Sequence, residues 1–246
     1  MRSLRVLILL VASVPVLAAC SGADALQAEQ LLQAANRAQS SISSETFSAH
    51  LSIEAKGQQM SLVLSGGGYA KGPRAGDMVM EMKISAPSLG AALPFDSIEI
   101  AKVGSSAWMT MGGKRVDLPA GSIASATGGN SDPLGAFDIT KYVKDVRVDG
   151  GQILDGKSVT KITGVLDTAS LVQRLASLGG ASAAAGLPSL DGHVSDTRVV
   201  VYVDDQTHLL VAALADFSLH AGGETVTMHL DVAVTGVNQP VALPAA

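Results

Sequence analysis

The side chains best suited to chemistry in this chain are five histidines and a single cysteine. The histidines are scattered without an HExxH pair, and one cysteine alone cannot build a thiolate zinc site. The chain has no GxSxG nucleophile elbow, and the glycines at 66–68 are followed by neither a P-loop lysine nor a helical pattern. The sequence therefore predicts no enzyme, with no catalytic residue, no metal site and no cofactor.

Two smaller groups of polar residues have simple explanations. Asp216 falls opposite His229 if a hairpin turns at Gly222-Gly223, and we expect an exposed pair worth well under ~1 kcal/mol. Asp204-Asp205 follows a run of valines, where turn chemistry explains two aspartates without a bound cation.

Cys20 differs from these residues because of what precedes it. Arg2 and Arg5 are followed by an apolar stretch at 6–16 and then by Leu17-Ala18-Ala19-Cys20, which is the layout of a secretory signal. Leu-Ala-Ala-Cys resembles the lipobox of bacterial lipoproteins. That resemblance implies that the Cys20 thiol receives a diacylglyceryl group and that Cys20 becomes the first mature residue. The alternative is an ordinary signal peptide with a chance cysteine.

The charge of the chain excludes some partners. The net charge is −5, and it becomes −7 once the signal with its two arginines is removed. An acidic chain has no positively charged surface to attract nucleic acid or anionic headgroups, so we expect no nucleic-acid partner. Membrane attachment must then come from the acyl chains on Cys20, of which two or more hold stably. This predicts a protein anchored on the extracytoplasmic side of the cell membrane, which we expect to be a monomer.

Alternating apolar and polar residues predict a sheet of antiparallel strands. The alternation begins at Thr46, and a turn at Gly57-Gln58 would place Ile53 opposite Leu62 and Leu51 opposite Leu64. A second long hairpin turns at Gly222-Gly223, with Phe217 facing Met228 and Leu219 facing Val226. Further strands are expected near 78–84, 98–100, 108–111, 114–118, 146–148, 159–166 and 199–203. The sequence leaves open which residues of the strands at 98–100 and 108–111 point to the same face as the apolar residues of the other strands.

Three helices are expected beside these strands. The first begins at Asp24, whose carboxylate forms a capping box with Gln27. The second begins at Asp132-Pro133, an N-cap followed by proline at the first helical position. The third follows Asp167 and ends at Gly179-Gly180.

The order of these elements resembles the LppX/LprG lipoproteins, which are built on the LolA/LolB half-barrel. The strand at 46–56 after a Ser-rich helix end, the hairpin from Trp108 to Lys114, and Asp132-Pro133 carry the resemblance. Val199 to Asp205, followed by Thr207-His208-Leu209, matches the hydrophobic strand and Asp-containing turn of that family. The resemblance implies an apolar space, inside a curved sheet, that holds acyl chains. The scarcity of aromatic residues, at 3%, is a departure from cavities of this kind.

We therefore predict an α+β fold: a strongly curved antiparallel sheet, or half-open β-barrel, with an N-terminal helix and two mid-chain helices over its concave side. The chain divides into a signal peptide at 1–19, a lipidated N-terminus and short tether at 20–23, a lipid-binding domain at 24–238, and a loose tail at 239–246. Pro240 and Pro244 are the basis for the last assignment.

The alternation also predicts which residues line the cavity. The methionines on the strand at 78–84 suit a changing apolar guest, because their side chains are flexible and polarizable. A filled core under the helices is the alternative explanation. The predicted lining residues are Leu51, Ile53, Leu62, Leu64, Met78, Met80, Met82, Ile84, Phe217, Leu219, Met228 and Leu230.

Two apolar loops, 86–95 and 180–190, could rim the mouth of this cavity, through Leu89, Leu93, Phe95 and Leu187. The expected function is to bind an acylated lipid or lipoglycan and to hold or transfer it across the envelope, with a transporter as a candidate partner. The alternative is an envelope lipoprotein with a filled core that acts as a protein-interaction module.

Overall fold

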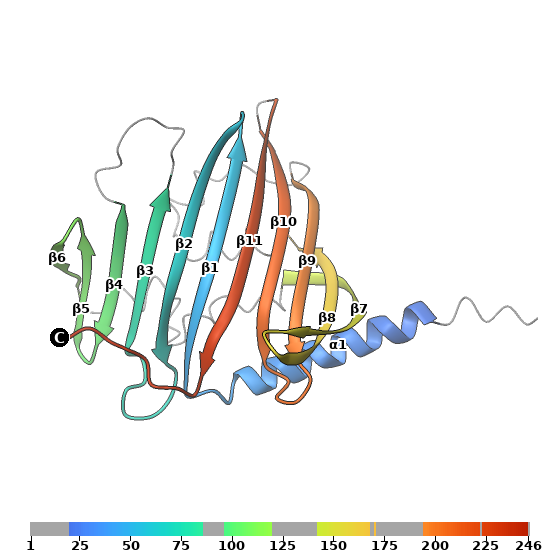
Figure 1. Ribbon diagram of the computed structural model, residues 1–246, viewed down its shortest axis with the longest axis horizontal. Helices are drawn as coiled ribbons and strands as arrows, with labels where there is room; N and C mark the ends of the chain where they lie inside the picture. Colours follow the sequence, from blue (N-terminus) through green and yellow to red (C-terminus); the bar gives the residue numbers. More distant parts are fainter. Residues whose placement is uncertain are drawn as a thin grey trace, which may run out of the picture.

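The computed structural model describes residues 20–85, 96–119, 142–167, 170, 194–221 and 223–245. These residues form one helix and eleven strands, which join in a single curved antiparallel sheet that does not close (Figure 1). The strand order is β6-β5-β4-β3-β2-β1-β11-β10-β9-β8-β7. The first strand of the chain, β1, therefore pairs with the last, β11, in the middle of the sheet. Within the described residues, no helix has the length and apolar content needed to span a bilayer.

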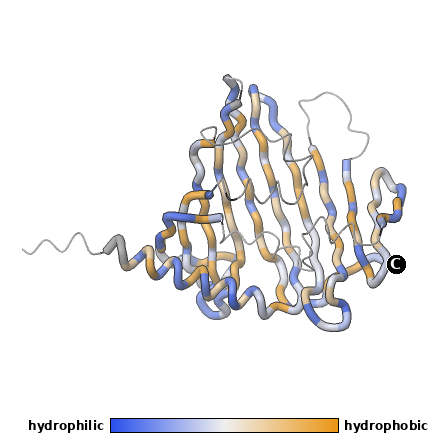
Figure 2. Tube along the Cα trace, turned by 180° about the vertical axis from the view of Figure 1, so that it is seen from behind, coloured by the Kyte–Doolittle hydropathy of each residue, from blue (hydrophilic) through white to orange (hydrophobic). Residues whose placement is uncertain are grey.

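The strands include every strand expected from the sequence, and several are longer than expected. Figure 2 shows hydrophobic and hydrophilic residues alternating along them. Their bounds are β1 Ser44–Ala55, β2 Gln58–Tyr69, β3 Met78–Ser85, β4 Ser97–Val103, β5 Ser106–Met111, β6 Lys114–Asp117, β7 Val143–Leu154, β8 Lys157–Leu166, β9 Val194–Asp204, β10 Leu210–Ala221 and β11 Glu224–Val237.

The register of the long β10–β11 hairpin is confirmed, because Phe217 pairs with Met228 and Leu219 with Val226. The predicted β1–β2 register is wrong by two residues: Leu51 pairs with Leu62. The turn is formed by Lys56-Gly57, both with positive φ (53° and 70°), instead of Gly57-Gln58. Two positive φ angles define the turn whose twist matches a hairpin. A shift of two residues keeps every side chain on its expected face.

Helix α1 spans Cys20–Gln39 and therefore begins four residues before the expected start at Asp24. Asp24 lies inside the helix, and the segment expected to be a tether is helical. A missing cap costs only about 1 kcal/mol, while each added residue extends the hydrogen-bonded helix, so a capping motif does not force a helix to begin. The helix packs mainly against β7 and, less extensively, against β9.

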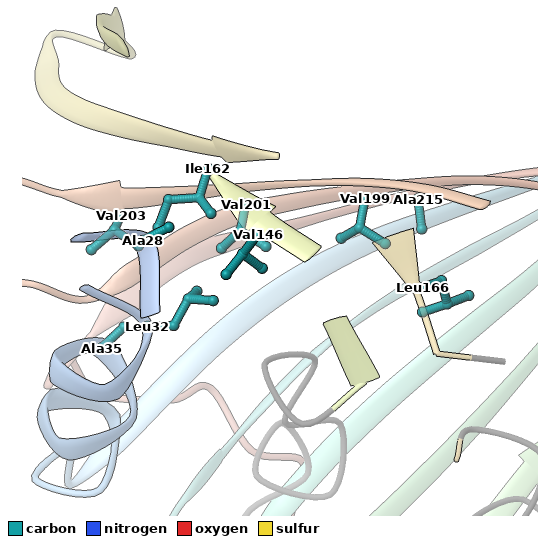
Figure 3. Packing of buried hydrophobic residues seen from close by; sticks show 10 residues of the cluster. All are labelled: Ala28, Leu32, Ala35, Val146, Ile162, Leu166, Val199, Val201, Val203 and Ala215. Atoms are coloured by element: carbon teal, nitrogen blue, oxygen red, sulfur yellow. The ribbon is translucent and has the colours of Figure 1, made fainter. Parts of the chain in front are cut away.

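The packed core lies between α1 and the β7–β9 end of the sheet (Figure 3). Ala28, Leu32 and Ala35 form one buried stripe of the helix. The small alanines let the helix approach the sheet, where Ile162 and Val201 are each 1% exposed. The whole cluster consists of Ala28, Leu32, Ala35, Val146, Ile162, Leu166, Val199, Val201, Val203 and Ala215.

Of the three expected helices, the described residues contain one. The segment from Asp132-Pro133 and nearly all of the segment after Asp167 lie outside the described residues. Ser170 is helical, and its backbone N–H donates to Oδ1 of Asp167 at 3.3 Å while its hydroxyl donates to Oδ2 at 2.8 Å. These are the contacts expected from an N-cap aspartate.

The C-terminal segment is held against the sheet, whereas the sequence suggested a loose tail. Val241 is 5% exposed, and its backbone N–H donates to the Tyr69 hydroxyl at 2.9 Å. The Ser44 hydroxyl donates to the carbonyl of Gln239 at 2.7 Å. From there the chain continues toward the β5 and β6 side of the sheet (Figure 1). Prolines favour extended backbone, which lets a short segment lie across strand ends instead of moving freely.

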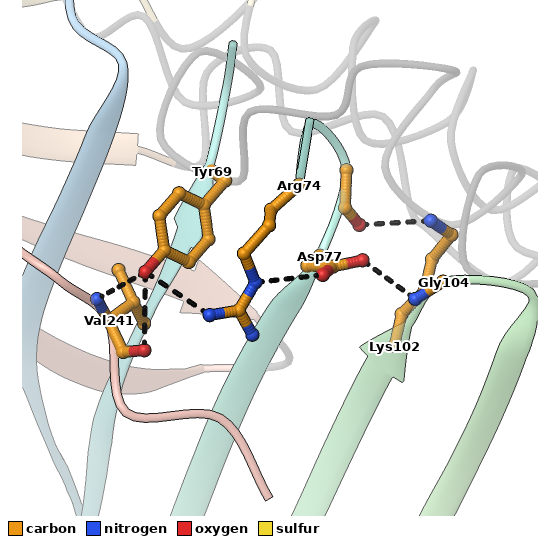
Figure 4. A network of polar contacts seen from close by, with 7 residues as sticks. Tyr69, Arg74, Asp77, Lys102, Gly104 and Val241 are labelled. Carbon is orange, nitrogen blue, oxygen red and sulfur yellow. Dashed lines mark hydrogen bonds and ion pairs between the residues drawn. The ribbon is translucent and has the colours of Figure 1, made fainter. Parts of the chain in front are cut away.

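Figure 4 shows the polar network that fixes this end of the sheet. The Arg74 guanidinium lies 4.7 Å from the centre of the Tyr69 ring and pairs with Asp77 at 3.3 Å. Asp77 also accepts the backbone N–H of Gly104 at 2.7 Å. The network therefore connects the tail through Tyr69 to the β2–β3 loop and the β4–β5 turn.

Candidate functional site

All twelve residues predicted to line a cavity lie on one face of the sheet, which we call the inner face because α1 packs against it. The register shows this strand by strand. Leu51 on β1 pairs with Leu62 on β2, which pairs with Ile84 on β3. On the other side, Leu51 pairs with Leu230 on β11, which pairs with Ala215 of the packed core.

The structure adds residues whose face the sequence left open. Ile98 pairs with Met82 on one side and Met111 on the other, and Ile100 likewise pairs with Met80 and Met109. Strands β4 and β5 thus extend the inner apolar face. The sequence could not decide this, because both strands are short and Trp108-Met109-Thr110-Met111 has large side chains on both faces.

Trp108 points away from the inner face. It is 2% exposed, pairs with Ala101, and lies under the Arg115 guanidinium, 3.9 Å from the ring centre. The one tryptophan of the chain therefore contributes to a small outer core instead of to the inner face.

Burial along the inner face is uneven. At the end of the sheet where β1 begins, Phe47 is 6% exposed and Met78 is 4% exposed. Toward the turns at 56–57 and 112–113, the inner residues of β1–β5 are half-buried. The packed cluster with α1 lies at the β7–β9 end. The inner face thus has a filled part under α1 and a broad, half-buried apolar part over β1–β5, β10 and β11.

The opposite, outer face carries polar side chains in cross-strand pairs. Asp216 Oδ1 lies 2.5 Å from Nδ1 of His229, as the hairpin register required, and both side chains are about half exposed. His220 lies between Ser195, at 2.8 Å, and Thr225, at 3.0 Å. Exposed pairs of this kind contribute little to stability. Within the described ranges, no three His, Cys, Asp or Glu side chains gather closely enough to hold a metal ion.

Asp204 and Asp205 form a hydrogen-bonded turn. The carboxylate of Asp204, 7% exposed, accepts the backbone N–H groups of Gln206 at 2.9 Å and Thr207 at 2.7 Å. Burial by itself raises the pKa of Asp204, but these hydrogen bonds outweigh it and hold the pKa below its ordinary value. Hydrogen bonds from Ser158 and Thr160 similarly lower the pKa of Asp205. Turn chemistry thus accounts for both carboxylates.

We expect the stability of the Asp204→Asn variant to depend on pH in the direction that the lowered pKa of Asp204 requires. A lowered folded pKa means that ionised Asp204 stabilises the fold above about pH 4, and that this contribution is lost as the pH falls through the folded pKa. Asparagine keeps the accepting oxygen but not the charge. The variant should lose about 1 kcal/mol of unfolding free energy at pH 7 and much less at pH 3, by urea unfolding. An equal loss at both pH values would contradict the assignment.

Some predicted positions lie outside this description. The mouth residues Leu89, Leu93, Phe95 and Leu187 fall outside the described residues. Cys20 is the first residue of α1.

Comparison with known proteins identifies the fold. By sequence, the chain matches no family model and no curated protein. By structure, it is similar to the lipoprotein LppX of Mycobacterium tuberculosis, with 16% identity, a TM-score of 0.50, and coverage of 89% of this chain and 99% of LppX. LprF from Mycobacterium bovis gives 15% identity, a TM-score of 0.48, and coverage of 89% and 97%. A LolA superfamily protein from Nitrosomonas europaea gives 9% identity, a TM-score of 0.23, and coverage of 85% and 94%.

The class of protein defined by this sheet is the unclosed antiparallel half-barrel with an N-terminal helix on its inner face. Within that class, the chain has an LppX-like fold, as the order of elements in the sequence implied.

Proposed function

We propose that this protein is a lipid-anchored carrier on the extracytoplasmic side of a bacterial membrane, and that its inner face binds the acyl chains of a lipid or lipoglycan. The observation that carries the proposal is the broad, half-buried apolar part of the inner face over β1–β5, β10 and β11. The likeness to LppX, itself described as a lipoprotein, supports the same reading.

The energetics favour binding through hydrocarbon alone. Each buried methylene contributes ~0.8 kcal/mol, so one palmitoyl chain gains at most about 12 kcal/mol, less the costs of association. A guest bound in this way needs no specific polar contact. Apolar residues contributed by seven strands, β1–β5, β10 and β11, suit such a guest better than they suit a small polar substrate, and we infer a binding role without catalysis.

The position of Cys20 supports the anchor. Cys20 begins the helix that packs on the sheet, and Ala28 is the first fully buried residue in the part of that helix, 23–39, whose burial is described. At 1.5 Å per residue, about 12 Å of helix separates the two positions. An acylated Cys20 would therefore hold the inner face close to the bilayer, where a guest is collected or delivered, with a membrane transporter as a candidate partner.

The test is whether acyl lipid copurifies with the protein. The chain from residue 20 onward, carrying Cys20→Ser so that it has no anchor of its own, is produced in two bacterial hosts and studied by native mass spectrometry and lipid extraction. We expect a bound acyl lipid from both hosts. A protein that is empty in both hosts, and that takes up no added lipid, would reject the carrier and favour an interaction module with a filled core.

A further inference from the structure

Seven of the eight methionines of this chain lie on one face of the sheet. The chain has eight methionines, and Met1 begins the signal segment. The register places all the others on the inner face: Met78, Met80 and Met82 on β3, with Met60 on β2, Met109 and Met111 on β5, and Met228 on β11. A random placement would distribute such residues over both faces of an alternating sheet.

These thioethers differ in exposure in a way that can be tested. Met78 is 4% exposed, whereas the other six are half-buried. The chain has no cysteine besides Cys20, whose thiol is consumed if it is acylated as proposed. Trp108 is enclosed beneath Arg115. Among the seven methionines that the structure describes, the six half-buried thioethers are therefore more accessible to a small oxidant than Met78.

We propose that the inner face is an oxidation site, where a two-electron oxidant such as hydrogen peroxide converts these six methionines to sulfoxides. The thioether sulfur attacks one peroxide oxygen, the O–O bond breaks, and an S–O bond forms. Sulfur loses two electrons, and the second oxygen leaves as water with both protons. The reaction needs no cofactor, and methionine sulfoxide reductases reverse it.

The consequence for binding rests on the proposed function. A sulfoxide is polar, and covering it with hydrocarbon removes its hydrogen bonds to water without replacing them. Oxidation of several lining residues should weaken the binding of an acyl chain by at least tenfold. The inner face would then release its guest under oxidative conditions and recover after reduction.

The experiment uses the chain from residue 20 with Cys20→Ser, which contains every described element of the fold. Lipid that copurifies is first removed by extraction, and its removal is checked by native mass spectrometry. The protein is then treated with hydrogen peroxide, the oxidant is removed, and each methionine is mapped by peptide mass spectrometry. Binding of a fluorophore-labelled palmitoyl lysophospholipid is measured before treatment, after treatment, and after incubation with methionine sulfoxide reductases. We expect all six half-buried methionines to gain oxygen before Met78, with binding weakened at least tenfold and restored by reduction.

A matched variant replaces the six by leucine, which has a similar volume and cannot form a sulfoxide. The variant carries Met60→Leu, Met80→Leu, Met82→Leu, Met109→Leu, Met111→Leu and Met228→Leu. Whatever affinity this variant has for the probe before treatment, peroxide should leave that affinity unchanged, because leucine has no sulfur to oxidise. If Met78 is oxidised at the same rate as the six, the proposed oxidation site is rejected. If all six become sulfoxides and the affinity for the probe is unchanged, the proposed effect of oxidation on binding is rejected. A probe that fails to bind the untreated protein would count against the proposed function, while the mapped sites would still test the oxidation.

Discussion

Leu64→Asp is expected to weaken the binding of a palmitoyl lipid by at least about a hundredfold. Leu64 lies on β2 at the centre of the inner face, where it pairs with Ala49 and Met82. A guest lying there would cover the new carboxylate with hydrocarbon. Burying an unpaired charge costs several kcal/mol, and a hundredfold loss corresponds to about 2.8 kcal/mol. The measurement is a fluorescence titration with a fluorophore-labelled palmitoyl lysophospholipid at pH 7.

The neighbouring residue provides the control. Val63 is on the same strand but points to the outer face, where it pairs with His50 and Lys83 and is 37% exposed. Val63→Asp adds the same charge one residue away, so its affinity should stay within about twofold of the original protein. Thermal unfolding of both variants checks that each remains folded. Equal affinities for the two variants would show that the guest does not lie on the inner face.

Gly67→Ala is expected to destabilise the fold by about 3 kcal/mol. Gly67 is buried between β1 and β3, and a Cβ built on it would lie 2.5 Å from the carbonyl oxygen of Glu45 and 2.8 Å from Cγ2 of Thr46. A backbone oxygen cannot rotate away as a side chain can, so the strands themselves must shift. Forcing extra volume into a packed site typically costs 1–3 kcal/mol. Urea unfolding measures the loss.

Gly151→Ala is the control for this prediction. Gly151 lies on the exposed strand β7, and the nearest atom to its added Cβ would be the carbonyl oxygen of Val159 at 3.8 Å. The change should alter the unfolding free energy by no more than about 0.5 kcal/mol. A loss at Gly67 as small as that at Gly151 would mean that β1 and β2 can separate freely at this point, contrary to the close approach in the structure.

The close approach of neighbouring strands also explains the run Gly66-Gly67-Gly68. In the sequence this run indicated only curvature or a bulge, since it lacks the other features of a phosphate-binding loop. In the structure, both Gly66 and Gly67 lie too close to backbone atoms of neighbouring strands for any side chain. The glycines are thus required by the close packing of β2 between β1 and β3.

Local pattern was enough to predict much of this protein. A period of two residues specifies which side chains share a face within a strand, and turn residues fix how two strands pair. For that reason the sequence predicted the inner placement of Leu51, Leu64 and Met82, and the pairing of Phe217 with Met228. The assignment of side chains to the two faces also remained correct despite the error in the β1–β2 turn, because a shift of two residues does not exchange the faces.

Tertiary contacts decided what local pattern could not. Nothing local indicates that β1 pairs with β11, or that α1 packs on β7 and β9, since these contacts join segments far apart in the chain. The docked tail depends in the same way on a hydroxyl of Tyr69, a residue 172 positions from Val241. The sequence by itself thus determined the faces of the strands, because side-chain alternation is a property of the backbone. Only the tertiary structure decided which faces join into one apolar surface and how far it is filled, because that depends on which distant segments pack together.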